Sequence, residues 1–364
     1  MIYLDNGATS LRKPRCVLEA VQRAMQTCAN PGRGGYGASM EASRTVYAAR
    51  EAAAQLFGCR SEQVVFTPGC TQGLNIAIRS LVPPGGSAVI SGFEHNAVVR
   101  PLHLLGARVT VAGRRLFDWA DTLESFEKAL KKHPDAAIFT HVSNVFGYIE
   151  PVDALAELCT AYGVPFIVDA AQSAGTLPVR PESWGAAFVA MPGHKGLLGP
   201  QGTGLLICRA EPKVLIAGGT GSESENPDMP AYLPDRLEAG TLNVPGIAGL
   251  GAGMRFLAQR GEELSMRESQ SARYCAELLK KLDVTVYSGE HQASTVSFVP
   301  KSDCEELAQR LAGSGICVRA GLHCAPLAHQ SAGTLQTGTV RVSFGADASP
   351  RQAEALLQCL KRAR

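Results

Sequence analysis

Short apolar segments alternate with longer segments of helical periodicity from about residue 14 to residue 330, and no other feature constrains the fold as strongly. The apolar segments are rich in β-branched residues and are typical of strands that are buried on both faces of a sheet. They cover residues 63–67, 87–91, 108–111, 136–140, 164–168 and 186–191. Helices are expected at residues 41–57, 71–81, 123–132 and 152–162. The pattern predicts an α/β fold with a mostly parallel sheet that is covered by helices.

This alternation changes near residue 245. Beyond it we expect a long helix over 247–282, strands at 284–287, 295–299 and 339–344, and helices at 304–314 and 350–364. Strands and helices that no longer alternate one for one indicate an α+β unit. We therefore predict a large domain over residues 15–245 and a smaller α+β domain made of residues 1–14 and 246–364.

The composition excludes several classes of protein. The 364 residues are 45% hydrophobic, and 35 basic side chains stand against 33 acidic ones, which gives no basic excess for a nucleic-acid partner. No apolar stretch is long enough to cross a bilayer, and the first residues lack the pattern of a signal peptide. The 11 cysteines are odd in number and contain no CxxC pair, which is typical of a reducing cytoplasm rather than of disulfides or a metal site.

A lysine and an aspartate follow two of the predicted strands. Asp169 comes directly after the segment at 164–168, and Lys195 lies in a glycine-flanked stretch after the segment at 186–191. Ligand chemistry in open α/β sheets collects at the carboxyl ends of the strands. Pyridoxal 5'-phosphate (PLP) needs a lysine for its Schiff base and an acid beside its pyridinium nitrogen. A solvated surface lysine is the usual alternative, but the pairing with Asp169 favours a PLP site.

Two glycine-rich stretches have features of an anion site. Residues 67–73 follow a strand and open a helix, so free backbone N–H groups and the helix dipole favour a phosphate there. A simple N-cap by Thr71 is a compatible interpretation. Residues 32–37 match GxGxxG but follow no strand, so we expect a flexible loop at the mouth of the site rather than a dinucleotide site.

Three further side chains are candidates for chemistry. His95 follows the strand at 87–91 and has either a structural role or a place on an aromatic cofactor ring. Cys324 lies beside His323 in a stretch between Gly and Pro. A cationic neighbour would lower the pKa of its thiol, which would make it reactive. The alternative interpretation is a buried, inert cysteine. Arg341 lies inside a predicted strand, where it must grip a substrate carboxylate or form an internal ion pair.

Taken together, these stretches resemble the class V aminotransferase-like PLP enzymes. Within that group the chain is most similar to the group II, Suf-type cysteine desulfurases, with the selenocysteine lyases alongside. The resemblance runs through residues 3–8, 94–97, 142–147, 169–173, 193–195, 238–243 and 319–325. It implies the aspartate aminotransferase-like fold type I, with PLP held by the large domain.

The resemblance implies a role for each residue around the cofactor ring. Lys195 would form the Schiff base and later move the Cα proton. Asp169 would pair with the pyridinium nitrogen, Gln172 would hydrogen-bond the phenolic oxygen, and His95 would stack on the ring.

It also implies how the phosphate is held. Thr71 and His194 would bind it, and Thr241 would reach a phosphate across the interface of a homodimer. Where the family usually has Ser or Thr three residues before the lysine, this chain has Pro192, so Cys70 or a backbone N–H is expected to replace that hydroxyl.

On the substrate side, the resemblance implies that Asn144 and Arg341 bind the carboxylate, with Arg319 nearby. Cys324 would attack the sulfur of L-cysteine, leaving alanine and an enzyme persulfide. Many group II enzymes have a second histidine where this chain has Leu322, which leaves the proton supply near Cys324 open.

The expected activity is therefore that of a cytoplasmic cysteine desulfurase that can pass its sulfur to a protein acceptor. The alternatives are a selenocysteine lyase, a cysteine sulfinate desulfinase or another class V PLP β-lyase. A PLP-binding or sulfur-carrier protein without turnover is a further alternative, from a different class. No metal, nucleic-acid or membrane partner is expected.

Overall fold

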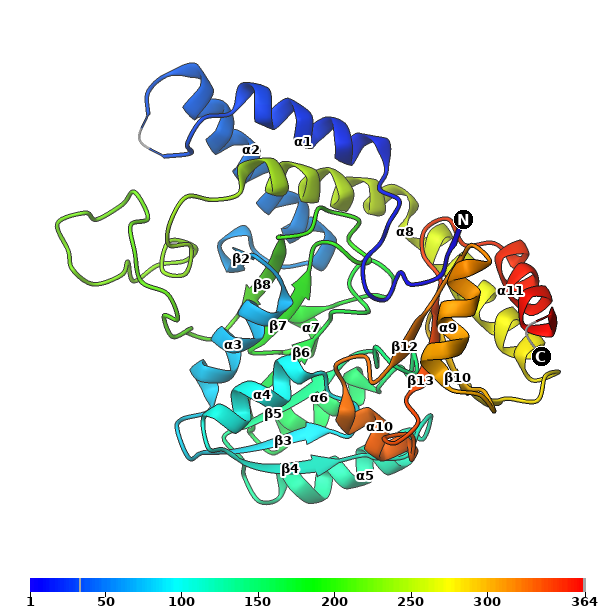
Figure 1. Cartoon of the computed structure of the whole chain (residues 1–364). Coiled ribbons are helices and arrows are strands. Elements are labelled where there is room, and N and C mark those ends of the chain that lie inside the picture. Colours follow the sequence, from blue (N-terminus) through cyan, green and yellow to red (C-terminus); the bar gives the residue numbers. More distant parts are fainter. Residues whose placement is uncertain (33, 363–364) are drawn as a thin grey trace.

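The computed structural model describes residues 1–32 and 34–362 (Figure 1). Arg33 in the predicted glycine-rich loop and the last two residues of the predicted terminal helix lie outside the described residues. Within the described part of the chain, no helix is both long and apolar enough to cross a membrane.

A seven-stranded sheet forms the centre of the fold, with strand order β2–β8–β7–β6–β5–β3–β4. Its strands are β2 (Val64–Thr67), β3 (Ser87–Ser91), β4 (Arg108–Ala112), β5 (Ala136–Thr140), β6 (Phe166–Asp169), β7 (Phe188–Pro192) and β8 (Gly204–Cys208). Strands β3 to β7 run parallel to one another, whereas β8 is antiparallel to both of its neighbours. The predicted α/β fold with a mostly parallel sheet is therefore confirmed, and β8 is the strand that the prediction missed.

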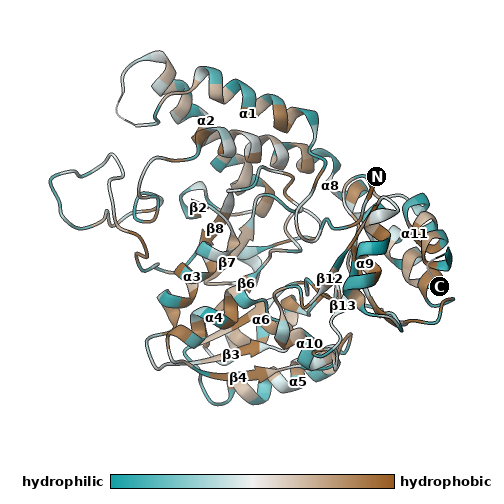
Figure 2. Ribbon diagram, in the orientation of Figure 1, coloured by the Kyte–Doolittle hydropathy of each residue, from teal (hydrophilic) through white to brown (hydrophobic). Residues whose placement is uncertain are grey.

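Helices cover both faces of this sheet. The helices of this part of the chain are α1 (Arg15–Thr27), α2 (Gly37–Phe57), α3 (Cys70–Leu81), α4 (Asn96–Leu104), α5 (Trp119–Leu130), α6 (Val152–Ala161) and the short α7 (Pro181–Trp184), with a 3-10 turn at Ser61–Gln63. Successive residues of β5 point into different cores: Ile138 packs with α3 and α4, and Phe139 packs with α2, α5 and α6. The strands accordingly are hydrophobic and the outer faces of the helices more hydrophilic (Figure 2). This is why the strand sequences are almost continuously apolar.

The remaining elements build a smaller unit beside the sheet (Figure 1). They are the long helix α8 (Val244–Leu279), β9 (Thr285–Tyr287), β10 (Thr295–Val299), α9 (Cys304–Gly313), β11 (Ile316–Cys317), β12 (Arg319–Gly321), α10 (Pro326–Ala332), β13 (Thr339–Ser343) and α11 (Pro350–Arg362). Four strands form an antiparallel sheet of order β12–β13–β10–β9, and β1 (Ile2–Tyr3) pairs in parallel with β11. Leu4 lies in the core of this unit, so the chain begins there before it runs to α1.

Helix α8 contributes to one core of the large sheet and to the core of the smaller unit. Leu250 and Met254 pack under the large sheet, while Cys275 and Leu279 pack in the smaller unit. The predicted boundary after residue 245 falls in the first turn of this helix. The division into two domains stays a prediction.

Candidate active site

One cavity gathers almost every residue that the sequence singled out. It has a volume of about 280 Å³ and lies where the carboxyl ends of β6 and β7 meet the loop after β12. Its lining includes Cys70, Thr71, His95, Asn144, Asp169, Gln172, His194, Lys195, Arg319, Cys324 and Arg341. Larger cavities lie elsewhere, one of them of about 1020 Å³, but this one combines the lysine, the acid, the arginines and the thiol.

Asp169 ends β6 with only 2% of its surface exposed. Its Oδ1 accepts hydrogen bonds from the Ala171 amide at 2.8 Å and from the Cys70 thiol at 3.4 Å. Its Oδ2 has no hydrogen-bond partner among the described residues. Asp169 lines the cavity, where this oxygen can accept a hydrogen bond from a ligand. A pyridinium N–H would satisfy it, so this acid fits the predicted cofactor.

The thiol of Cys70 is turned toward Asp169. Burial and the neighbouring carboxylate raise the pKa of this thiol well above its usual range, so it stays protonated and acts as a donor. The helix that begins at Cys70 has Gly69 as its N-cap and no capping side chain, so the N-cap interpretation of Thr71 is wrong. The helix starts one residue earlier than expected, which leaves its first N–H groups free for an anion.

Lys195 follows β7 and extends into the cavity. Burial lowers the pKa of its amine, an effect that the charge of Asp169 partly opposes. Nδ1 of the neighbouring His194 forms a hydrogen bond with Thr9 Oγ1 at 3.1 Å. Burial, with the charges of Lys195 and Lys13, lowers the pKa of His194 to about 4, so this ring is neutral near pH 7.

His95 has the structural role that the sequence allowed, and its place on a cofactor ring stays a prediction. It is the N-cap of α4, where its Nδ1 accepts a hydrogen bond from the Ala97 amide at 3.0 Å, and it also lines the cavity. Burial lowers the pKa of this imidazole. Because Nδ1 is an acceptor, the neutral ring carries its proton on Nε2.

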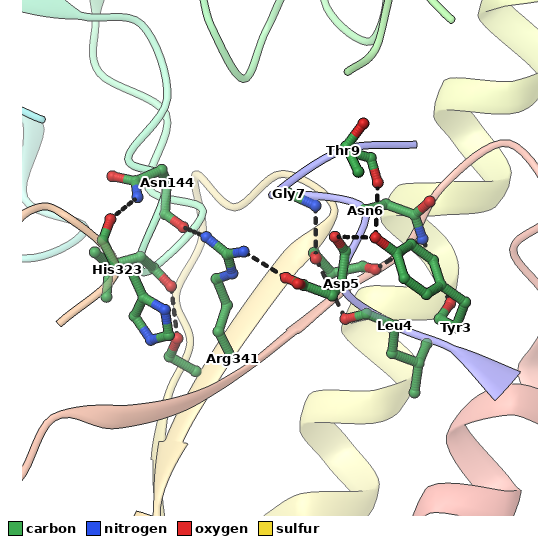
Figure 3. A network of polar contacts seen from close by, with 12 residues as sticks. Tyr3, Leu4, Asp5, Asn6, Gly7, Thr9, Asn144, His323 and Arg341 are labelled. Atoms are coloured by element: carbon green, nitrogen blue, oxygen red, sulfur yellow. Dashed lines mark hydrogen bonds and ion pairs between the residues drawn. The ribbon is translucent and has the colours of Figure 1, made fainter. Parts of the chain in front are cut away.

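Arg341 realises the internal ion pair, one of its two predicted alternatives (Figure 3). It is 2% exposed, its Nη2 donates to Asp5 Oδ1 at 2.6 Å, and its Nη1 donates to the Asn144 carbonyl at 3.0 Å. Its Nε has no partner among the described residues. Arg319 stands directly opposite on β12, exposed and in register with Arg341. Three guanidinium N–H groups of Arg341 thus remain for another ligand.

Cys324 is exposed at the edge of the same cavity. His323 and Cys324 both have left-handed backbone conformations, with φ of 50° and 58°. Their carbonyl groups are held by the Asn144 amide at 2.8 Å and by the Asn96 N–H at 2.8 Å. Consecutive left-handed residues other than glycine are costly and cluster at functional loops that their surroundings over-determine.

His323 is not the cationic neighbour that the sequence suggested for this thiol. Its ring is buried, and Nε2 contacts the hydroxyl of Thr339 at 3.1 Å. Burial, with the charge of Arg341, lowers the pKa of His323 to about 2, so the ring is neutral. The expectation is wrong because the ring packs inward against β13. The basic side chains that share the cavity with Cys324 are Lys195, Arg319 and Arg341.

Thr241 lies outside this cavity. It is exposed and lines the separate cavity of about 1020 Å³, together with Arg50 and Glu238. Within one chain, therefore, the structure does not bring Thr241 to Lys195.

Sequence reasoning missed two acids beside the site. Asp5 pairs with Arg341. Glu94 is fully buried and accepts hydrogen bonds from Ser91 Oγ at 2.6 Å and from the Thr140 amide at 2.8 Å. Burial and the nearby Glu150 raise the pKa of Glu94 well above its usual range. For Glu94, the only signal in the sequence was its position directly before His95. For Asp5, the only signal was that it lies in one of the stretches that resemble the family.

The fold and the site define a PLP-dependent transferase of fold type I. The chain belongs to the aminotransferase class-V family, whose model matches residues 2–356, and enzymes of this family use PLP. A protein of Methanothermobacter thermautotrophicus described as a probable cysteine desulfurase is 31% identical, over 94% of this chain and 90% of its own length.

Two solved structures agree with this assignment. The apo structure of a cysteine desulfurase from Thermococcus onnurineus NA1 superposes with a TM-score of 0.90 at 31% identity, over 100% of this chain and 94% of that one. The cysteine desulfurase CsdA from Escherichia coli, in an S-sulfonic acid form, gives 0.88 at 26% identity, over 99% and 94%. The predicted family and fold type are confirmed.

Proposed function

We propose that this protein is a PLP-dependent cysteine desulfurase that converts L-cysteine to L-alanine and carries the sulfur as a persulfide on Cys324. The observation that carries this proposal is the shared cavity of Lys195, Asp169, Arg341 and Cys324. Relatives described as probable cysteine desulfurases, at about 30% identity over nearly the whole chain, support it. Binding of PLP alone would need neither the arginine pair nor a thiol at the cavity edge.

The residues present fit the cofactor. Asp169 would hold the pyridinium nitrogen with its free Oδ2, and His95 would cover the ring. Gln172 donates one amide hydrogen to the Gly7 carbonyl at 3.0 Å, which leaves the second for the phenolic oxygen. The uncapped start of α3, with Thr71 and His194, would hold the phosphate. When bound, PLP withdraws electrons from the substrate's Cα.

The protein's own groups then bind the substrate and move its protons. Arg341, Arg319 and the Asn144 amide would bind the carboxylate, because guanidinium groups match the geometry of that anion. Lys195 would take the Cα proton, since its lowered pKa increases the fraction of neutral amine. The neutral His95 presents an Nε2–H donor.

Sulfur transfer falls to Cys324. Its thiolate would attack the sulfur of L-cysteine, so that an S–S bond forms while the Cβ–S bond breaks. The electron pair of the broken bond goes to Cβ, which takes a proton and becomes the methyl group of alanine. The exposed Cys324 can then pass the outer sulfur to a protein acceptor. The held carbonyl groups at 323 and 324 keep this thiol at the cavity edge.

A direct test uses the purified protein with PLP. L-Cysteine should yield alanine, and mass spectrometry should find one added sulfur on Cys324. Cys324→Ala should abolish turnover of cysteine while leaving the visible absorbance of bound PLP intact. Full cysteine turnover by Cys324→Ala would refute the persulfide route; selenocysteine or cysteine sulfinate turning over faster would favour those lyases instead.

We also propose a cytoplasmic homodimer with the two domains stated above. The exposed position of Thr241, away from the cavity of its own chain, supports a role in the neighbouring subunit's site.

A further inference from the structure

The segment of residues 3–13, here called the N-terminal strap, contacts several parts of the candidate site. The carboxylate of Asp5 pairs with the guanidinium of Arg341 at 2.6 Å (Figure 3). The carbonyl of Gly7 accepts the hydrogen bond from Gln172 at 3.0 Å. One short stretch therefore contacts both a residue proposed for the substrate carboxylate and a residue proposed for the cofactor.

The end of the strap holds the lysine loop. The carbonyl oxygen of His194 accepts hydrogen bonds from Thr9 Oγ1 at 3.1 Å, from Ser10 Oγ at 3.0 Å and from Lys13 Nζ at 2.9 Å. Ser10 Oγ also lies 3.1 Å from the carbonyl of Lys195. The strap thus links the lysine of the large sheet to the arginine of the small sheet.

The strap is itself fixed to β13 through Ser343. The Ser343 amide donates to the Leu4 carbonyl at 2.8 Å, and the Gly7 amide donates to Ser343 Oγ at 2.7 Å. Asn6 Nδ2 donates to the Ser343 carbonyl at 3.1 Å, and the Tyr3 hydroxyl donates to the Asp5 carbonyl at 3.1 Å. The backbone of Asp5 is therefore placed by its neighbours on both sides, whatever its side chain contacts.

The guanidinium of Arg341 depends on few contacts for its orientation. Asp5 and the Asn144 carbonyl receive one N–H each, and Gly7 packs so closely that an added Cβ would lie 3.2 Å from Arg341 Cζ. The Asp5 contact is an ion pair with charge on both partners, whereas the Asn144 carbonyl is a neutral acceptor. Loss of Asp5 would leave only the hydrogen bond to the Asn144 carbonyl to set the plane of the guanidinium.

The charges around Arg341 leave room for one further anion. Arg319 stands directly across from Arg341 in the β12–β13 register, an arrangement that is unfavourable for two like charges. Asp5 is the only acid among the described residues that forms an ion pair with either arginine. The positive charges of Arg319 and Arg341 therefore face the single carboxylate of Asp5, and a second carboxylate bound between the two arginines would balance them.

We infer that Asp5 is a positioning residue: it fixes the guanidinium of Arg341 in the orientation that receives the carboxylate of the amino-acid substrate. This inference rests on the substrate proposed above. Asp5 does not line the cavity, so it acts through Arg341 rather than by touching the substrate.

The test compares Asp5→Ala and Asp5→Asn with the wild type in the PLP-loaded enzyme. L-Alanine and L-alaninamide are titrated, and the visible absorbance of the cofactor reports binding. Asp5→Ala should weaken binding of L-alanine by about tenfold to a hundredfold. Asp5→Asn keeps an oxygen acceptor and should weaken it less. L-Alaninamide should bind all three proteins alike, and KM for L-cysteine should rise more than kcat falls.

Asp347→Asn is the matched control, because Asp347 pairs with the exposed Arg12 and its replacement removes the same charge without touching Arg341. Unchanged or tighter binding of L-alanine in both Asp5 variants would overturn the inference, as would equal weakening for alanine and its amide. If the wild type binds L-alanine but makes none from L-cysteine, the proposed desulfurase fails while the role of Asp5 is still tested by these titrations.

Discussion

Glu268 provides a quantitative test of the fold, because it is an acid buried in the long helix α8. Only 6% of its surface is exposed, and its helix packs there against the smaller unit. Burial raises its pKa from 4.5 to about 8, with Ser294 lowering and Asp347 raising the value. The folded protein therefore keeps a proton on Glu268 at pH values where the unfolded chain has released it.

The sign of the pH dependence follows from that difference. Below pH 4.5 Glu268 is protonated in both states, so its ionisation does not affect the free energy of unfolding. As the pH rises toward 8, the folded state loses stability, because the unfolded state binds fewer protons. The two pKa values differ by about 3.5 pH units, and each unit corresponds to about 1.4 kcal/mol. The free energy of unfolding should therefore fall by up to about 5 kcal/mol across this range because of this one group.

Glu268→Gln should remove the effect, because glutamine has nearly the same shape and no charge to bury. We expect urea unfolding, followed by tryptophan fluorescence, to show variant and wild type within about 1 kcal/mol at pH 5 and several kcal/mol apart at pH 8. Glu262→Gln, an exposed position on the same helix, is the control and should follow the wild type. A constant difference between Glu268→Gln and wild type from pH 5 to 8 would refute the argument.

Two further predictions concern the ion pair of Arg50 and the assembly of the protein. Arg50 and Glu238 form a buried bidentate pair at 2.9 and 2.8 Å, so Arg50→Met should leave an unpaired buried acid and cost about 3–5 kcal/mol in a urea melt. Arg44→Met, whose pair with Glu41 is exposed, should cost less than about 1 kcal/mol, and equal costs would contradict this account. Light scattering should give the mass of a dimer, and Thr241→Val should weaken PLP binding; a fully active monomer would rule out the shared site.

Much of the fold was predictable because its strands are buried on both faces. Each of the six strands predicted for the large sheet is present, within two residues at either end. Strand β8 was missed because a short apolar run such as Gly204–Cys208 carries no periodicity that distinguishes a strand from a buried helix segment. Its antiparallel direction depends on pairing with β2 and β7, which local sequence does not encode.

The site was predictable where it follows from the sheet. Asp169 and Lys195 come together because adjacent parallel strands end at the same edge. The charge state of His323 was not predictable, since it depends on packing against Thr339. The partner of Arg341 was also hidden, because Asp5 lies 336 positions away and reaches it only through the strap beside β13.

The sequence by itself determined the sheet, the lysine and acid at its edge, and the thiol that points to sulfur chemistry, because these depend on local periodicity and on side-chain chemistry. The tertiary structure decided which hydrogen bonds and charges each group meets. Burial made His323 neutral, turned Cys70 into a donor to Asp169, and joined Asp5 to Arg341. Electrostatic environment depends on distance and solvent exposure, and both arise only when distant segments of the chain pack together.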